Sequence, residues 1–480
     1  MTLPEVNQPF SMSGLFWKPD APDKHVPGRL YRTEEGIRVQ LFDDLRPGPS
    51  YVPTAPDDEN TSYEEVPSPH QDDPLTLHGH LSGGHRVTAC ECITVQSRET
   101  WSSQQVAEYV LTPRHVLFGG HTTGLDQEFT GIKIRTAGLD EWAELPGFTR
   151  SRSNDNTFHI SLRSEAPEPV SLLSGASLAL TQTPQFTPLT PRSGAITRET
   201  WLKITGLAPA TSQQLDSSIL TPLTTLICLC TGQDDPATHI QLTIDGKQWL
   251  PLAANYLHPP RSTKTEKPLA GLTDLGLTGV ASWLDQVDRL GPLPPVVAHF
   301  SAHQRTTRLE TAVLELTTVA EGLHARLFPD TRRLGEQDCD LAKKHVREAV
   351  KDLNPNIGEI LRSMLTHLAE PGYTTRLREL AAAVEPAAPG ICGKTNRWAA
   401  AVSTARNSYA HRTAGMIEEE DWGALLTVIE SLAWLMRCLL LLNAGLSEET
   451  LRQRLRHNSS YLLFLNRAAH NLPNAYPAAI

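Results

Sequence analysis

An arginine and a histidine lie five residues apart, at Arg406 and His411, in a segment whose composition favours a helix. Histidine has an ordinary pKa of about 6.5, so it can act as a base or as an acid at neutral pH. Arginine stays charged and can hold two phosphate oxygens at once. Asn407 precedes His411 by four residues, so the two share a helical face. This combination suits acid–base chemistry on a phosphate ester.

The helix that carries these residues should begin after Gly393, because Gly390 and Gly393 interrupt the chain and good helix formers follow. At about 100° per residue, one narrow stripe collects the residues that should be buried, namely Trp398, Val402, Ala405 and Tyr409. Asn407 and His411 fall roughly opposite that stripe, and Arg406 lies at its border. Arg406 and His411 are about 140° apart on an ideal helix, so helix irregularity or a second copy must bring them together.

The motif lies in a basic stretch of an acidic chain. No Asp or Glu occurs from residue 386 to residue 417, which suits an anionic ligand. We expect four residues of this stretch to contact such a ligand beside the motif: Lys394, Arg397, Arg412 and Tyr409. Three alternatives stay open. The basic residues could be a chance cluster on a solvated helix, Tyr409 could be a core aromatic, and Arg406 with His411 could be a structural pair.

The composition describes a protein of two or three globular domains. The chain has 480 residues, 39% of them hydrophobic and 20% charged. Its net charge of −11 argues against a protein that coats nucleic acid by bulk electrostatics, but not against a local RNA site. The first thirty residues contain no apolar signal core, which favours a cytoplasmic location.

Neither cysteine nor histidine spacing indicates a metal or a cofactor. Two cysteine pairs have only one residue between them, which is short for zinc, so the seven cysteines are expected to be buried thiols: Cys90, Cys92, Cys228, Cys230, Cys339, Cys392 and Cys438. Five histidines of the first half have no ligand spacing, and surface or strand positions explain them: His78, His80, His85, His115 and His121. The apolar run from Ala424 to Leu442 contains Glu430 and Arg437, so it is expected to be a core helix rather than a membrane span.

Hydrophobic periodicity divides the chain into a β-rich part and a helical part. Residues 1–300 show strand-like alternation, with a Ser-, Thr- and Pro-rich sub-boundary near 165–200 and a hinge at Leu290–Pro295. Residues 305–457 show helical spacing, beginning with a stripe at Leu309, Val313, Leu316, Ala320, Leu323 and Leu327. Residues 458–480 read as a tail. The predicted fold class is α+β and multidomain, with a β-rich domain before an all-α bundle.

The arrangement Arg406-Asn-x-x-x-His411 in a late helix resembles the signature of HEPN ribonucleases. The whole chain resembles the ApeA-like subfamily of prokaryotic anti-phage defence proteins, which place a β-rich domain before a HEPN domain. Four elements of the first half carry that part of the resemblance, in this order: Gly14-Leu-Phe-Trp17, the strand at Gly28, Gly119-Gly120-His121, and the pair Leu139 and Trp142.

The resemblance implies a metal-independent endoribonuclease that works in abortive infection. His411 would be the general acid or base, Arg406 would stabilise the phosphorane, and Asn407 would assist. Two protomers of a homodimer or higher homo-oligomer would face each other and form one composite site. The substrate would be cellular RNA, with tRNA as a candidate, and the β-rich domain would sense a phage-derived trigger. No membrane partner is implied.

A second hypothesis is a non-catalytic HEPN-type module that binds nucleotide or protein, or a scaffold. An intact Arg406 and His411 pair favours the enzyme, because a binding module could lose either residue. Glu321 and His324, three residues apart on the first helix of the bundle, could lie near the site or could be a surface pair.

Overall fold

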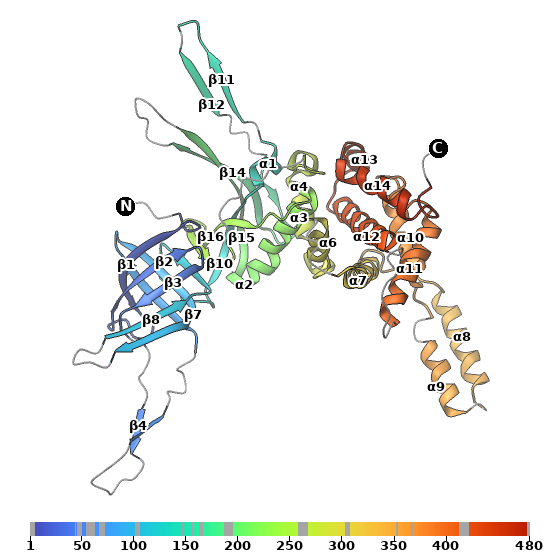
Figure 1. Ribbon diagram of the computed structural model, residues 1–480, viewed down its shortest axis with the longest axis horizontal. Helices are drawn as coiled ribbons and strands as arrows, with labels where there is room; N and C mark the ends of the chain where they lie inside the picture. The colour runs from blue at the N-terminus through green and yellow to red at the C-terminus, as the bar shows by residue number, and fades with distance from the viewer. Residues whose placement is uncertain are drawn as a thin grey trace. The chain divides into compact units, whose positions relative to one another are not determined.

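The computed structural model describes most of the chain, and Figure 1 shows how its elements are arranged. The described residues are 5–43, 45, 50–53, 63–66, 73–100, 106–145, 147–155, 157–162, 167–186, 195–257, 267–302, 308–351, 354–365, 368–411 and 422–477. The chain divides into two compact units, Met1–Thr224 with Asp235–Thr265, and Thr225–Asp234 with Glu266–Ile480. The first is β-rich and the second is helical.

The first unit is built around a closed antiparallel barrel. The strands that form the ring are β1 (Phe10–Trp17), β2 (Val26–Thr33), β3 (Gly36–Leu41), β8 (Val106–Thr112), β7 (His85–Thr100) and β6 (Leu75–Leu81). The ring closes because β7 pairs with β6 along one edge and with β8 along the other. Burial alternates along β2, so Val26, Leu30 and their neighbours on the same face fill the interior with Phe16 and Val87.

An open sheet extends this barrel. Its strands follow the order β13 (Val170–Ser171), β14 (Ser177–Phe186), β15 (Ile196–Thr211), β10 (Glu128–Thr136), β16 (Ala237–Thr243), β17 (Leu250–Ala254) and β9 (His115–Phe118), and β9 pairs with β7. One face is buried through residues such as Ile132, Ile204 and Leu242. The helix α2 (Ser212–Leu215) contacts β10 and β15, and α1 (Leu139–Ala143) contacts β15. Two separate hairpins are β4 (Ser50–Pro53) with β5 (Tyr63–Val66), and β11 (Phe148–Arg152) with β12 (Phe158–Leu162).

The second unit is a helical assembly around one apolar helix, α12 (Trp422–Asn443). The other helices are α4 (Leu272–Leu284), α5 (Val287–Leu290), α6 (Leu293–Ser301), α7 (Leu309–Leu327), α8 (Glu336–Ala349), α9 (Pro355–Met364), α10 (Tyr373–Val384), α11 (Thr395–His411), α13 (Glu448–Arg456) and α14 (Ser459–Asn471). Before them, η1 (Asp216–Leu220) leads into α3 (Thr221–Thr231), whose later residues belong to this unit. Helix α12 contacts α6, α7, α10, α11 and α14. The predicted α+β class, with a β-rich part before a helical bundle, is confirmed.

Helix α12 is long and apolar enough to cross a membrane, yet 83% of its most apolar window is buried inside the protein. Its two charged residues explain how it fits a protein core. Arg437 donates to the carbonyl oxygens of Leu229, at 2.6 Å, and Cys230, at 3.3 Å. Glu430 accepts from Arg467 of α14 at 2.7 Å. Each charge therefore has a protein partner, as a buried charge requires.

Three predicted boundary segments of the chain differ from the structure. The stretch near 165–200 contains β14 and the start of β15, which pair in one sheet. Along β14, buried Leu178 and Leu180 alternate with the less buried Ser177, Ala179 and Thr181. The hinge at 290–295 contains the end of α5 and the start of α6, which belong to the helical unit. The region 458–480 contains α14, which buries Tyr461, Phe464 and Ala468.

All seven cysteines lie among the described residues and are buried thiols. Burial raises the pKa of Cys90 and of Cys438 to about 12. Within the described ranges, no group of three or more metal-type side chains is placed to hold an ion. His78 and His121 instead stack in parallel, with ring centres 4.6 Å apart, and donate to the carbonyls of Thr122 and Gly79.

We expect Arg437→Met to lower the free energy of unfolding by about 2–3 kcal/mol, because two buried carbonyls lose a charged donor. Thermal and urea unfolding would measure the change. Arg456→Met is the matched control, since Arg456 is exposed on α13 and should tolerate the same substitution. Equal free energies of unfolding for the two variants would contradict a structural role for Arg437.

Candidate active site on helix α11

Helix α11 is held against the core by the stripe that its sequence predicts. Trp398 and Val402 are completely buried, while Ala405 and Tyr409 are partly buried. The indole Nε1 of Trp398 donates to Oγ of Ser431 on α12 at 2.8 Å. A buried hydrogen bond of this kind fixes the rotation of α11 about its own axis. The opposite face, which includes Asn407, is exposed.

The start of α11 is anchored by residues that lie far along the chain. The backbone N–H of Lys394 donates to the carbonyl of Ala475 at 2.7 Å, and the hydroxyl of Tyr476 donates to the carbonyl of Ile391 at 2.8 Å. Gly393 has a φ of 50°, and a Cβ there would meet the Ala475 oxygen at 2.3 Å. Only glycine fits at this close approach. The segment after α14 therefore positions the motif helix.

Three helices converge on the guanidinium of Arg406. Its Nη2 lies 2.8 Å from Oε2 of Glu321 on α7, and its Cζ lies 4.2 Å from the ring centre of Tyr373 on α10. Tyr373 is tied to α7, because its hydroxyl donates to the carbonyl of Thr317 at 3.3 Å. Burial raises the pKa of the Tyr373 phenol above its usual range, so the ring stays neutral. The Arg406 side chain keeps 29% of its surface exposed, which leaves room for an anion.

The structure places the other predicted site residues unevenly. Asn407 follows Arg406 and is exposed. His411 is the last residue of α11, and its side chain and the whole of Arg412 lie outside the described residues. Helix α11 is continuous to His411, so Arg406 and His411 are about 7.5 Å apart along the axis within one chain. Helix irregularity therefore does not bring them together.

Lys394 and Arg397 lie away from the group that Arg406 forms with Glu321 and Tyr373. Both are exposed, and they lie at the start of α11. Arg397 precedes Arg406 by nine residues, which places it about 13 Å away along the axis and on the opposite face. A ligand that contacts Arg406 and Arg397 together would have to extend around the helix.

A second polar pair lies one turn beyond Glu321 on α7. Nε2 of His324 lies 2.5 Å from Oε2 of Glu379 on α10, and the imidazole stacks on Phe328 with centres 5.2 Å apart. His324 is 1% exposed, and in the described part of the chain its Nδ1 has no hydrogen-bond partner. The three-residue spacing of Glu321 and His324 in the sequence indicated that both could lie near the site. It gave no signal for Tyr373 or Glu379, because both reach the site from another helix.

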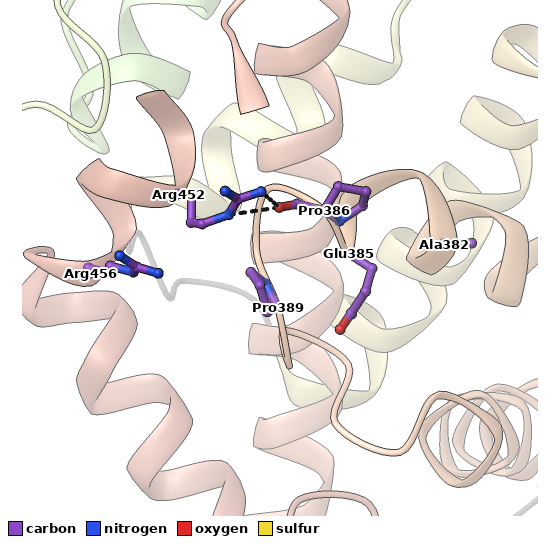
Figure 2. Close-up of a pocket in the computed structure, with 6 residues that line it drawn as sticks. All are labelled: Ala382, Glu385, Pro386, Pro389, Arg452 and Arg456. Carbon is purple, nitrogen blue, oxygen red and sulfur yellow. Dashed lines mark hydrogen bonds between the residues drawn. The ribbon is translucent and has the colours of Figure 1, made fainter. Parts of the chain in front are cut away.

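A separate open pocket lies between the end of α10, with the segment that follows it, and the second half of α13, as Figure 2 shows. Its lining residues are Ala382, Glu385, Pro386, Pro389, Arg452 and Arg456. Arg452 already donates to the Pro386 carbonyl and pairs with Glu449 at 2.5 Å. None of these residues contacts Arg406 among the interactions of the described chain, so the pocket is not an extension of the motif site.

A double-mutant cycle should detect the link between α7 and α11. We expect Glu321→Ala and Arg406→Ala to show a coupling free energy of about 0.5–1 kcal/mol, since the pair is only partly buried. Chemical unfolding of the four variants measures it. The control cycle replaces Arg406→Ala with Arg397→Ala, which is exposed on the same helix and should show no coupling with Glu321. A Glu321–Arg406 coupling of zero would rule out the ion pair in solution.

Comparison with known families supports the interpretation of both units. Residues 11–273 match the family described as ApeA N-terminal domain 1, and residues 314–450 match the family described as Apea-like HEPN. No curated protein and no solved structure matches the chain. The second match contains the whole of α11, with Arg406 and His411. The resemblance seen in the sequence is confirmed: this chain belongs to the ApeA-like family and carries a HEPN domain toward its C-terminus.

Proposed function

We propose that this protein is a metal-independent endoribonuclease of an anti-phage, abortive-infection system. One observation carries the proposal. In a HEPN domain, an arginine that is partly exposed and braced by Tyr373 and Glu321 lies on the same helix as His411. The brace fixes a permanent positive charge on the helix that also carries a residue able to exchange protons at neutral pH. Both are what cleavage of a phosphodiester requires.

The reaction uses the substrate's own 2′-hydroxyl as the nucleophile. A histidine removes the hydroxyl proton while the oxygen attacks the neighbouring phosphorus. A second proton is delivered to the departing 5′-oxygen as the P–O bond breaks. Arg406 stabilises the charge that gathers on the phosphorane oxygens, and the exposed Asn407 helps to orient them. The products are a 2′,3′-cyclic phosphate and a 5′-hydroxyl.

One chain supplies one motif histidine, whereas the reaction calls for a base and an acid. We infer a homodimer, or a higher homo-oligomer, in which the motifs of two protomers face each other across one RNA strand. One His411 then acts as the base and the other as the acid. The regularity of α11 favours this arrangement, since it keeps Arg406 and His411 apart within a protomer.

The ion pair between Arg406 and Glu321 keeps the proposed site inactive in its resting state. A phosphate must displace the carboxylate, or share the guanidinium with it, before Arg406 can act. A nuclease directed at cellular RNA, with tRNA as a candidate, needs such restraint in an uninfected cytoplasm. In this proposal the β-rich unit senses a phage-derived trigger and relieves the restraint.

The same ion pair favours one competing function. If Glu321 and Arg406 serve only to join α7 to α11, the domain is a non-catalytic HEPN-type module or scaffold that binds nucleotide or protein. The two functions differ in what His411 does. A module needs no proton transfer, so its activity would not depend on the imidazole.

We expect His411→Ala and Arg406→Ala to abolish the cleavage of total cellular RNA that the wild-type protein shows in the presence of EDTA once its restraint is relieved. The wild-type products should end in cyclic phosphate. Purified proteins and end-labelling of the products give the measurement. The matched control is Arg397→Ala, which removes an exposed charge from the same helix and should retain cleavage. Cleavage of equal extent by His411→Ala would refute the proposed mechanism.

We expect Glu321→Gln to lower the KM for RNA about two- to fivefold, because removing a partly exposed ion pair frees about 0.5–1 kcal/mol of phosphate affinity. Initial rates at low salt measure this effect. Glu315→Gln is the control, since Glu315 is exposed elsewhere on α7. A raised KM would mean that Glu321 assists binding and does not compete with the phosphate.

A further inference from the structure

Two lysines face each other on the sheet of the first unit. Lys133 of β10 and Lys203 of β15 are direct cross-strand partners, and both are partly buried. Their strand neighbours Ile132, Ile134 and Leu202 point to the buried face, so the lysines share the opposite face. Like charges directly opposite each other destabilise a sheet. Such a pair needs a compensating partner.

An indole is the partner that the structure provides. The ammonium groups of Lys133 and Lys203 lie 4.3 Å and 5.7 Å from the ring centre of Trp249. The ring also lies close to Gly131, where an added Cβ would be 3.4 Å from its Cη2. Gly131 is on the same face of β10 as Lys133, so the glycine leaves space for the indole against the strand. We call Lys133, Lys203 and Trp249 the lysine–tryptophan platform.

The hairpin that presents Trp249 is fixed. Asp245 accepts hydrogen bonds from the backbone N–H groups of Lys247, at 2.8 Å, and Gln248, at 3.0 Å. The Gln248 side chain donates to the carbonyl of Gly119 at 2.8 Å. The position of the indole is therefore set by the turn and by the end of β9, independently of the lysines.

The charge of the platform is not neutralised. Across the described residues, neither Lys133 nor Lys203 forms an ion pair with a carboxylate. Burial, and then the neighbouring Lys203, lower the pKa of Lys133. The next basic residue on that face, Arg135, is paired with Glu199 at 3.4 Å. Two adjacent cations that have an aromatic neighbour but no carboxylate partner in the described part of the chain, in a protein of net charge −11, mark a place for an anion.

We propose that the lysine–tryptophan platform binds single-stranded RNA. Phosphates of the RNA pair with the two ammonium groups. A base stacks on the face of the indole that the ammonium groups do not cover. Gln241 of β16 is the cross-strand partner of Lys133 on the other side, so its amide can reach a base edge. Alternating phosphates and flat bases match adjacent cations and an aromatic ring, whereas a simple anion would have no use for the indole.

This inference rests on the proposed function for the choice of RNA, and it assigns a substrate contact outside the HEPN domain. The binding step does not need cleavage. A 2′-O-methyl oligouridine lacks the nucleophile of the proposed reaction, so it reports binding alone. The test therefore separates a failure of the platform from a failure of the nuclease.

The experiment uses the full-length protein and a fluorescein-labelled 2′-O-methyl oligouridine, read by anisotropy over a range of salt. We expect Lys133→Ala, Lys203→Ala and Trp249→Ala each to weaken binding about tenfold. Each lysine variant should also reduce the slope of log K against log salt by about 0.7. Trp249→Phe keeps an aromatic face and should retain most of the affinity. Lys247→Ala, an exposed lysine of the same hairpin, should bind nearly as wild type.

Three results would overturn the proposal. If Lys247→Ala weakens binding as much as Lys133→Ala, the effect is non-specific charge. If Trp249→Ala and Lys133→Ala bind as wild type while circular dichroism shows them folded, the platform has no part in RNA binding. Binding of heparin that falls in parallel with RNA, with Trp249→Ala unaffected, would assign a general polyanion surface instead.

Discussion

A guanidinium between a carboxylate and an aromatic ring is the contact on which the candidate site depends. Arg406 on its own would be a long, mobile side chain on an exposed helix. Glu321 fixes the direction of the charge, and Tyr373 supports its flat face. Because these partners come from α7 and α10, the site exists only when three helices have packed together. The candidate site is therefore complete only when the bundle has packed.

The packing of the three helices depends in turn on α12. This helix is buried over most of its length, and it contacts α7, α10 and α11 at once. Trp398 and Ser431 join it to the motif helix through a buried hydrogen bond. Arg437 joins it to the carbonyl end of α3. A single apolar helix with few, fully satisfied polar contacts thus sets the position of the charged site.

The amino-acid sequence predicted what depends on local periodicity. The stripe through Trp398 and Val402 is buried, and so are Val313, Leu316 and Leu323 on α7. Contacts between helices could not be predicted in this way, because nothing near Tyr373 marks it as a partner of Arg406. The region after residue 458 did hold a signal, with Tyr461, Phe464 and Ala468 at helical spacing. The predicted tail omits this helix, because residues 305–457 already contain as many residues as a small domain needs.

The anchoring of α11 has a consequence for the order in which the protein is made. Ala475 and Tyr476 contact Gly393 and Lys394 and anchor them. The ribosome adds these two residues about eighty residues later. A nascent chain therefore carries the motif arginine and histidine without the contacts that seat their helix. If the protein is the ribonuclease proposed above, this delay protects the RNA of the cell that synthesises it. Chains that stall or end early before Ala475 lack the anchor altogether.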